Sequence, residues 1–223
     1  MFAEKVIKFY ENLDMPQNLP NEVSVMNPYA NEITFALTNK FFEKFYSDNN
    51  KRTFIVGINP GRFGGGVTGI AFTDPINLEE KCGIKNNLDK KHELSSRFVY
   101  RFIDSFGGAD KFYSKFFISA LYPLALIKDG KNYNYYDSKK VYSSLKPQIL
   151  KTFKQQIDFG ANDKYVISFG KRNAEYVKEI NDEIGYFKEI IIFDHPRFIM
   201  QYRLKKLDEY LDKYTKILSK VSK

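Results

Sequence analysis

Four short, uninterrupted apolar runs constrain the fold of this chain more than any other feature of its sequence. They span residues 53–58, 116–121, 165–169 and 190–193. None of them alternates cleanly between polar and apolar residues, as a strand with one solvated face would. Continuous apolar strands are typical of a parallel sheet that helices cover on both faces. The runs therefore predict four buried strands of one parallel sheet.

Segments with the periodicity of amphipathic helices surround these runs. They span residues 2–13, 35–46, 94–106, 138–158, 171–184 and 200–219. Alternating strands and helices predict a three-layer α/β/α fold with a central, roughly four-stranded parallel sheet. No repeat or linker divides the chain, so we expect a single domain over 1–223. Residues 1–50 would form a helical lead-in and residues 51–223 the core, in which the polar stretch 74–93 would be the longest loop.

An excess of positive charge points to a polyanionic partner. The chain has 35 Lys and Arg against 27 Asp and Glu, a formal net charge of +8. Such a balance favours nucleic acid. Many basic proteins bind no polyanion, so charge by itself leaves open a surface that is merely solvated.

The scarcity of cysteine and histidine restricts disulfides and metal sites. Cys82 is the one cysteine, and His92 and His195 are the two histidines. An intramolecular disulfide is therefore excluded, and a zinc site is nearly so. The N-terminus is typical of an amphipathic helix and not of a signal peptide. No apolar stretch approaches the roughly 20 residues of a membrane span, so we expect a cytoplasmic protein.

A glycine-rich loop, NPGRFGGGVTG at residues 59–69, follows the first predicted strand. Gly64, Gly66 and Gly69 satisfy G-x-G-x-x-G, but that dinucleotide motif opens a helix, and residues 70–75 do not look like a helix start. The Gly-Lys-Ser/Thr of a P-loop is also missing. Exposed N–H groups at the carboxyl end of a strand instead suit a phosphate or a flat polar ring. The alternative is a plain turn with Asn59 as a turn residue.

A second polar cluster follows the last predicted strand. His195 precedes Pro196, and a residue before proline is held in an extended conformation. Residues 197–203, RFIMQYR, interleave basic and aromatic side chains. That composition suits contact with nucleic acid and equally suits the first turn of a docked helix. A lone histidine is more often structural than catalytic, but this one shares with Asn59 a place at the end of a core strand.

The two clusters together resemble the single-strand-selective monofunctional uracil-DNA glycosylases of the uracil-DNA glycosylase superfamily. That family carries N-P-G-x-F-G-x-x-x-T-G-x-x-F after its first core strand, and residues 59–72 fit this motif without a gap. Its later His-Pro step corresponds to His195 and Pro196. Between them, residues 121–124 with Gly130 and Asn132 resemble the family's middle strand and following loop.

The resemblance spans roughly residues 53–215 and implies both a fold and a reaction. The fold would be a four-stranded parallel sheet flanked by helices, without metal or cofactor. The protein would be a monofunctional DNA glycosylase of base excision repair, acting as a monomer on single- or double-stranded DNA. It would flip the target base into a pocket at the strand ends, because the glycosidic carbon is out of reach inside a stacked duplex.

The resemblance also implies a role for each site residue. Asn59 would orient the attacking water, because an amide is no base at neutral pH. His195 would donate a hydrogen bond to the departing base, and Phe72 would stack on it. The expected contacts to base and phosphate are Gly61, Phe63, Gly64 and Gly65, and the expected contacts to DNA are Arg62, Arg197, Phe198 and Arg203.

Two departures from the family motifs affect the choice of base. The family reads the uracil edge with an Asn on its middle strand, where this chain has Ala120, a loss of ~1–3 kcal/mol of discrimination. Ser119 is the nearest substitute, although strand alternation points it to the other face. The second motif has Arg197 and Phe198 in place of Ser-Pro. We therefore expect uracil or a related deaminated base as the target.

Two functions of other classes stay open. A non-catalytic nucleic-acid-binding protein on the same fold would explain Ala120. A small-molecule hydrolase or nucleotide-binding enzyme would use the glycine-rich loop without any affinity for DNA.

Overall fold

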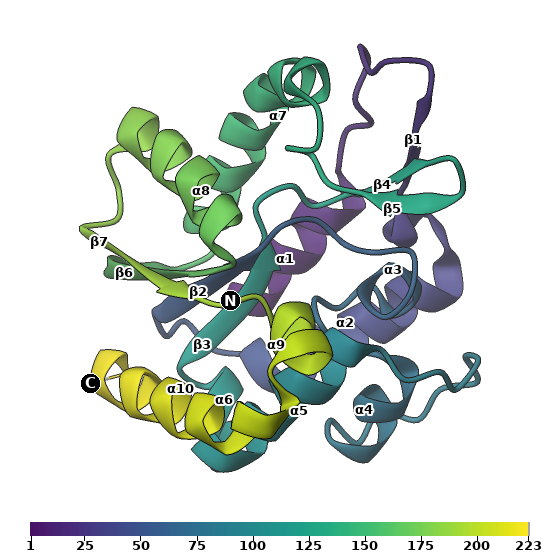
Figure 1. Ribbon diagram of the computed structural model, residues 1–223. Helices are drawn as coiled ribbons and strands as arrows, with labels where there is room; N and C mark the ends of the chain where they lie inside the picture. The colour runs from purple at the N-terminus through teal and green to yellow at the C-terminus, as the bar shows by residue number, and fades with distance from the viewer. Residues whose placement is uncertain (223) are drawn as a thin grey trace.

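A four-stranded parallel sheet lies at the centre of the computed structural model, which describes residues 1–222 (Figure 1). The strands are β2 (Arg52–Gly57), β3 (Phe116–Ala120), β6 (Ala161–Phe169) and β7 (Glu189–Phe193). Their order is β3-β2-β6-β7, and every neighbouring pair is parallel. Each contains or overlaps one of the four apolar runs, so the prediction of a buried parallel sheet is confirmed.

The pleat of this sheet sorts its aromatic side chains between two faces. On one face, Phe54 and Phe117 pack against Phe2 of α1 (Phe2–Glu11), at ring-centroid distances of 6.4 and 5.2 Å. On the other face, Phe169 packs against Phe102 of α5 (Leu94–Phe106), at 6.2 Å. Both faces therefore bury apolar surface, which explains why the strands do not alternate in polarity.

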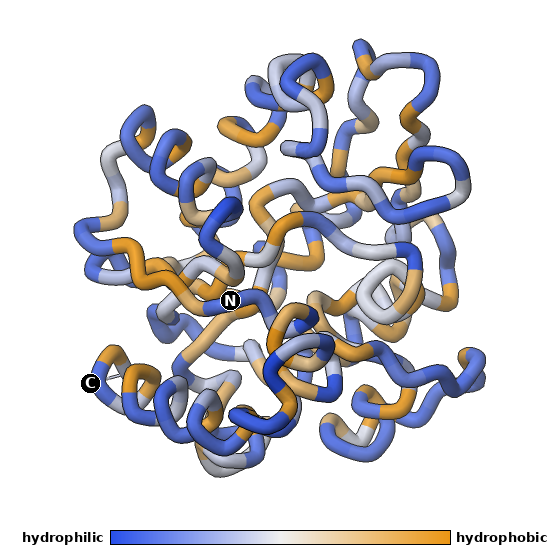
Figure 2. The backbone as a smooth tube through the Cα atoms, viewed as in Figure 1, coloured by the Kyte–Doolittle hydropathy of each residue, from blue (hydrophilic) through white to orange (hydrophobic). Residues whose placement is uncertain are grey.

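Helices form a layer on each face of the sheet. On the face of Phe54 lie α1, α2 (Glu32–Tyr46), α7 (Lys139–Ile157) and α8 (Lys171–Ile184). On the face of Phe169 lie α5, α6 (Ala109–Tyr113), α9 (Pro196–Tyr202) and α10 (Leu207–Val221). Figure 2 shows the backbone orange along much of the central strands and mostly blue on the outward turns of the helices. No helix in the described part of the chain is long and apolar enough to span a bilayer.

A second, three-stranded sheet was not predicted. Its strands β1 (Val23–Met26), β4 (Ala125–Lys128) and β5 (Lys131–Tyr133) pair antiparallel in the order β1-β4-β5. Asp129 and Gly130 join β4 to β5 with positive φ angles of 50° and 67°. Two such residues form the tight turn that the twist of a hairpin favours. β1 lies within the expected helical lead-in over 1–50 and is a strand because β4 pairs with it. A short 3-10 helix at Pro28–Ala30 follows it.

The interpretation of residues 70–75 as no helix start, and of 74–93 as one long loop, was wrong. The glycine-rich loop contains one turn of helix, α3 (Gly65–Thr68), and α4 (Pro75–Glu80) follows. Asp74 caps α4 by accepting a hydrogen bond from the backbone N–H of Asn77 at 2.8 Å. Aspartate followed by proline is a common helix start, so the local signal was present in the sequence.

The single predicted helix over 200–219 is divided in the structure. α9 starts earlier, at Pro196, and ends at Tyr202, where Arg203 leaves helical geometry with φ −132° and ψ 22°. A turn of 3-10 helix, η2 (Leu204–Lys206), leads into α10. Both α9 and α10 pack against α5, and α9 also reaches the cleft at the end of the sheet.

Candidate active site

A cleft of about 1000 Å³ opens at the carboxyl end of the parallel sheet. Gly57 at the end of β2, Ala120 at the end of β3 and His195 just after β7 line it. Its walls come from the glycine-rich loop, the segment before α5, the β4–β5 hairpin and α9, which surround the end of the sheet in Figure 1. The residues predicted for the site that line this cleft are Asn59, Gly61, Arg62, Phe63, Gly64, Gly65, Phe72, Ala120, His195, Arg197 and Phe198.

The Asn59 side chain is held by backbone groups of the β4–β5 hairpin and the residues after it. Its Nδ2 donates to the carbonyl oxygen of Tyr133 at 3.0 Å, and its Oδ1 accepts from the N–H of Tyr135 at 3.2 Å. Because donor and acceptor are both engaged, the amide has one orientation. Oδ1 keeps a second lone pair for another partner.

Asn132 of β5 holds the next part of the glycine-rich loop. Its Oδ1 accepts from the N–H of Arg62 at 2.9 Å. A Cβ atom at Gly61 would lie 2.9 Å from its Nδ2, closer than side chains normally approach. The loop and the hairpin are therefore in direct contact at a position where only glycine fits without a shift.

Phe72 forms an aromatic wall of the cleft. Its backbone has a φ of 54°, a conformation that is uncommon for a bulky residue. A Cβ at Gly57 would lie 2.6 Å from the Phe72 ring, so the ring sits directly against the end of β2. Its ring centroid is 5.1 Å from that of Phe169 and 5.9 Å from that of His195. The strained backbone and the close contacts give the ring a fixed place beside the histidine.

His195 is the N-cap of α9, and this contact sets its tautomer. Its Nδ1 accepts from the N–H of Arg197 at 3.2 Å. Burial, together with the positive charge of Arg197, lowers its pKa from 6.5 to about 4. A neutral imidazole that accepts at Nδ1 carries its proton on Nε2. Near neutral pH, His195 is therefore an uncharged donor through Nε2.

Two residues predicted for the site lie outside the cleft. Ser119 is fully buried on the opposite face of β3 from Ala120, and its Oγ has no hydrogen-bond partner among the described residues. The alternation of the strand thus keeps Ser119 from replacing the missing amide. Arg203 follows the end of α9, where its guanidinium lies over the Phe198 ring, 5.1 Å from the centroid.

The cleft also contains residues that the sequence did not single out. Several carry polar groups, and they are Asp89, Lys91, His92, Glu93, Asn134 and Tyr136. Gln201 and Tyr202, from the stretch 197–203 expected to contact nucleic acid, also line the cleft. Both histidines of the chain therefore line one cleft, and His92 Nδ1 lies 3.8 Å from the buried Asp74 carboxylate. The Asp129–Gly130 turn was the available signal for the hairpin residues. Among the described residues, no group of three or more His, Cys, Asp or Glu side chains is placed to hold a metal ion.

Comparison with known proteins agrees with this geometry. The sequence profile of the uracil DNA glycosylase superfamily matches residues 43–219, a span that includes both Asn59 and His195. The crystal structure of wild-type Pedobacter heparinus SMUG2 is similar, with 38% sequence identity and a TM-score of 0.94. The match covers 99% of this chain and 97% of that one. None of the curated proteins matches the chain. The chain therefore belongs to the uracil DNA glycosylase superfamily, a group of N-glycosyl hydrolases.

Proposed function

We propose that this glycosylase removes uracil or a related deaminated base from DNA, with Asn59 placing the water and His195 stabilising the departing base. The observation that carries the proposal is the meeting of three groups in one cleft. An amide of fixed orientation, an aromatic wall at Phe72 and a neutral imidazole donor all lie at the carboxyl end of the sheet.

Base flipping brings the bond to these groups. The glycosidic carbon is out of reach in a stacked duplex, so the nucleotide rotates into the cleft. A cleft of about 1000 Å³ has room for a base and its sugar. The base stacks on Phe72, and the N–H groups of residues 61–65 contact the base and its phosphate.

His195 stabilises the leaving base. As the bond between the sugar and the base breaks, its electron pair moves onto the base and negative charge appears on a base oxygen. The Nε2–H of His195 donates to that oxygen and stabilises the charge as it develops. Because the pKa of His195 is about 4, the group enters the reaction uncharged and keeps its proton.

Asn59 positions the nucleophile and takes no proton. An amide has no basicity near neutral pH, so it only orients the water. The free lone pair of Oδ1 accepts one water hydrogen and directs the water oxygen at the electron-poor sugar carbon. The new bond joins the water oxygen to that carbon, and the released proton passes to solvent or to the departing base.

A glycosylase assay tests the proposal. A single-stranded and a duplex oligonucleotide with one uracil or one hypoxanthine are incubated with the protein, and alkali then cleaves abasic sites. We expect strand breaks from the wild type and almost none from the Asn59→Ala/His195→Ala double variant. Equal breaks from both proteins, or none from the wild type on any deaminated base, would overturn the proposal.

One observation favours a second function. Ala120 lines the cleft where the related glycosylases carry a base-reading amide. A protein that has lost this contact and only binds DNA would show salt-dependent affinity without strand breaks in the same assay.

A further inference from the structure

Lysines gather along one side of α10, with Glu209 among them. The buried side of the helix contains Tyr214 and Leu218. At 3.6 residues per turn, the lysines of α10 and Glu209 fall to one side of this buried face and the aspartates to the other. The lysines Lys206, Lys213, Lys216 and Lys220 form what we call the basic flank. The aspartates are Asp208 and Asp212.

Most of the basic flank has no acidic partner. Within residues 1–222, Lys206 approaches Glu209 at 3.5 Å, and the other three lysines form no ion pair. A helix that is merely solvated gains from oppositely charged pairs four residues apart. α8 forms such a pair, Lys178 with Asp182. On α10, Glu209 and Asp212 stand four residues before Lys213 and Lys216, but neither pair approaches within 4 Å. The basic flank therefore leaves positive charge available to an external anion.

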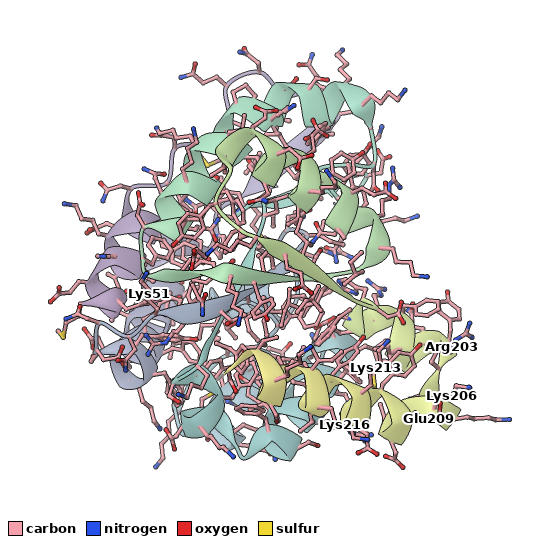
Figure 3. All side chains as sticks on the ribbon, turned by 90° about the vertical axis from the view of Figure 1, so that its left-hand side faces the viewer. Lys51, Arg203, Lys206, Glu209, Lys213 and Lys216 are labelled. Atoms are coloured by element: carbon pink, nitrogen blue, oxygen red, sulfur yellow. The ribbon has the colours of Figure 1, made fainter. Side chains whose placement is uncertain are left out.

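The basic flank begins at the mouth of the cleft. A second depression, lined by residues 201–206 and Tyr210, shares Gln201 and Tyr202 with the cleft. Figure 3 shows Arg203, Lys206, Lys213 and Lys216 on one face of the molecule, with Arg203 at the α9 end and the lysines following α10. The cations thus continue from the cleft and do not form an isolated patch.

Exposed aromatic rings mark the junction between the cleft and the flank. Phe198 is 37% exposed and Tyr202 is 66% exposed, and their ring centroids lie 5.6 Å apart. Aromatic rings beside a basic groove are the means by which proteins hold an extended nucleic-acid strand, because bases stack on the rings and phosphates lie on the cations. On α10 itself no large apolar side chain is exposed, and Leu204 of the lead-in is 56% exposed.

We propose that the basic flank binds the phosphate backbone of the DNA strand as it leaves the cleft. The proposal rests on the proposed function, because it requires a nucleotide in the cleft. At about 1.5 Å per residue, the path from Arg203 to Lys216 spans about 20 Å. One strand advances about 3.4 Å per nucleotide, so about six nucleotides on one side of the flipped base reach Lys216.

The test compares Lys213→Gln/Lys216→Gln with Lys8→Gln/Lys40→Gln. Lys8 and Lys40 are exposed lysines of α1 and α2, in the opposite helix layer, so the control removes the same charge elsewhere. Fluorescence anisotropy measures the affinity for undamaged single strands of 6 and 24 nucleotides over a range of salt concentrations. Each lost phosphate contact lowers the slope of log K against log salt by about 0.7.

For the 24-nucleotide strand, we expect the flank variant to bind about tenfold more weakly than the control at low salt. Its slope of log K against log salt should be smaller in magnitude by about 1.4. For the 6-nucleotide strand, centred on the cleft, the two variants should agree within about twofold. Two results would refute the proposal that the basic flank binds DNA. One is an equal salt slope for the flank and control variants on the 24-nucleotide strand. The other is a loss of affinity of the flank variant on the 6-nucleotide strand as large as its loss on the 24-nucleotide strand. The proposal would also be refuted if the wild type bound phosphatidylserine vesicles but bound the 24-nucleotide strand no more tightly than the 6-nucleotide strand.

Failure of this proposal is distinguishable from failure of the proposed function. The anisotropy assay uses undamaged DNA and needs no excision. If the wild type excises a base but the flank substitutions leave DNA affinity unchanged, the proposed function stands and the proposed DNA contact of the basic flank is refuted. A wild type that excises no base loses the proposed function, whatever the salt slopes are.

Discussion

Asn59 and His195 line the same cleft but are held in place by different kinds of contact. The Asn59 amide bonds the backbone of residues 74 and 76 positions away, in and beyond the second sheet. His195 bonds a backbone N–H only 2 positions away, in the helix that it caps. The orientation of one residue is thus a tertiary property, and that of the other is a local one. Their dependence on distant substitutions should differ accordingly.

The largest expected effect comes from the locally held residue. His195→Ala removes the hydrogen bond to the departing base, and we expect kcat to fall on the order of 10²–10³-fold. The substitution also removes the cap of α9, so a thermal melt must accompany the kinetics. His195→Asn serves as the matched variant, because it can cap the helix but places its donor differently. A loss of stability without a loss of kcat in the folded protein would contradict the proposed role.

Asn132 tests the tertiary side of the comparison. Asn132→Ala removes the acceptor for the Arg62 N–H and the contact with Gly61, while leaving Asn59 in place. A displacement of about 1 Å in a positioning group costs up to ~10²-fold, so we expect kcat to fall roughly 10- to 100-fold with little change in KM.

Asn134→Ala is the matched control for this experiment. Asn134 also lines the cleft, but its side chain donates to Asp137 at 3.4 Å and forms no hydrogen bond with the glycine-rich loop. Its replacement should leave kcat within a few fold of the wild type. If both variants lose the same activity, the loss reflects general packing of the hairpin and not the contact between Asn132 and the glycine-rich loop.

The sequence predicted the parts of the molecule that depend on local pattern. The four apolar runs identified the parallel sheet, and the ends of the first and last strands identified Asn59 and His195. The second sheet escaped because β1 is only four residues long and its pairing with β4 spans about a hundred residues. Asp129–Gly130 and Asp74–Pro75 were local signals, for a hairpin and a helix start, that the interpretation passed over.

The site was predictable where a residue directly follows a core strand. Phe72, Gly61, Gly64 and Gly65 line the cleft, and the motif resemblance identified them as a group. His92 was missed as a cleft residue because a segment without regular periodicity brings it there. Ser119 was named as a site residue although strand alternation already pointed its side chain away from the site. In the structure it is buried on the opposite face of β3 from Ala120. The roles of the cleft residues stay predictions until activity is measured.

Ala120 gives a prediction about the choice of base. Ala120→Asn adds an amide to the cleft at the end of β3, where the motif resemblance implies a base-reading amide. One such contact contributes ~1–3 kcal/mol, so we expect the ratio of kcat/KM for uracil over hypoxanthine to rise about tenfold. Ala120→Leu adds similar bulk without hydrogen bonds and should lower both rates alike. An unchanged ratio in Ala120→Asn would mean that the edge of the base lies away from β3.

The smallest expected effect concerns pH and separates the two histidines. The pKa of His195 is lowered to about 4, so the neutral, active form predominates above that pH and is lost as the pH falls through it. At pH 5 about nine tenths of His195 is neutral, and kcat should change less than about twofold between pH 5 and 8. An ordinary histidine pKa of about 6.5 would instead reduce kcat roughly thirtyfold at pH 5. His92→Gln removes the only other histidine, so a fall toward pH 5 that persists in this variant would assign the ordinary pKa to His195 and contradict its buried, uncharged state.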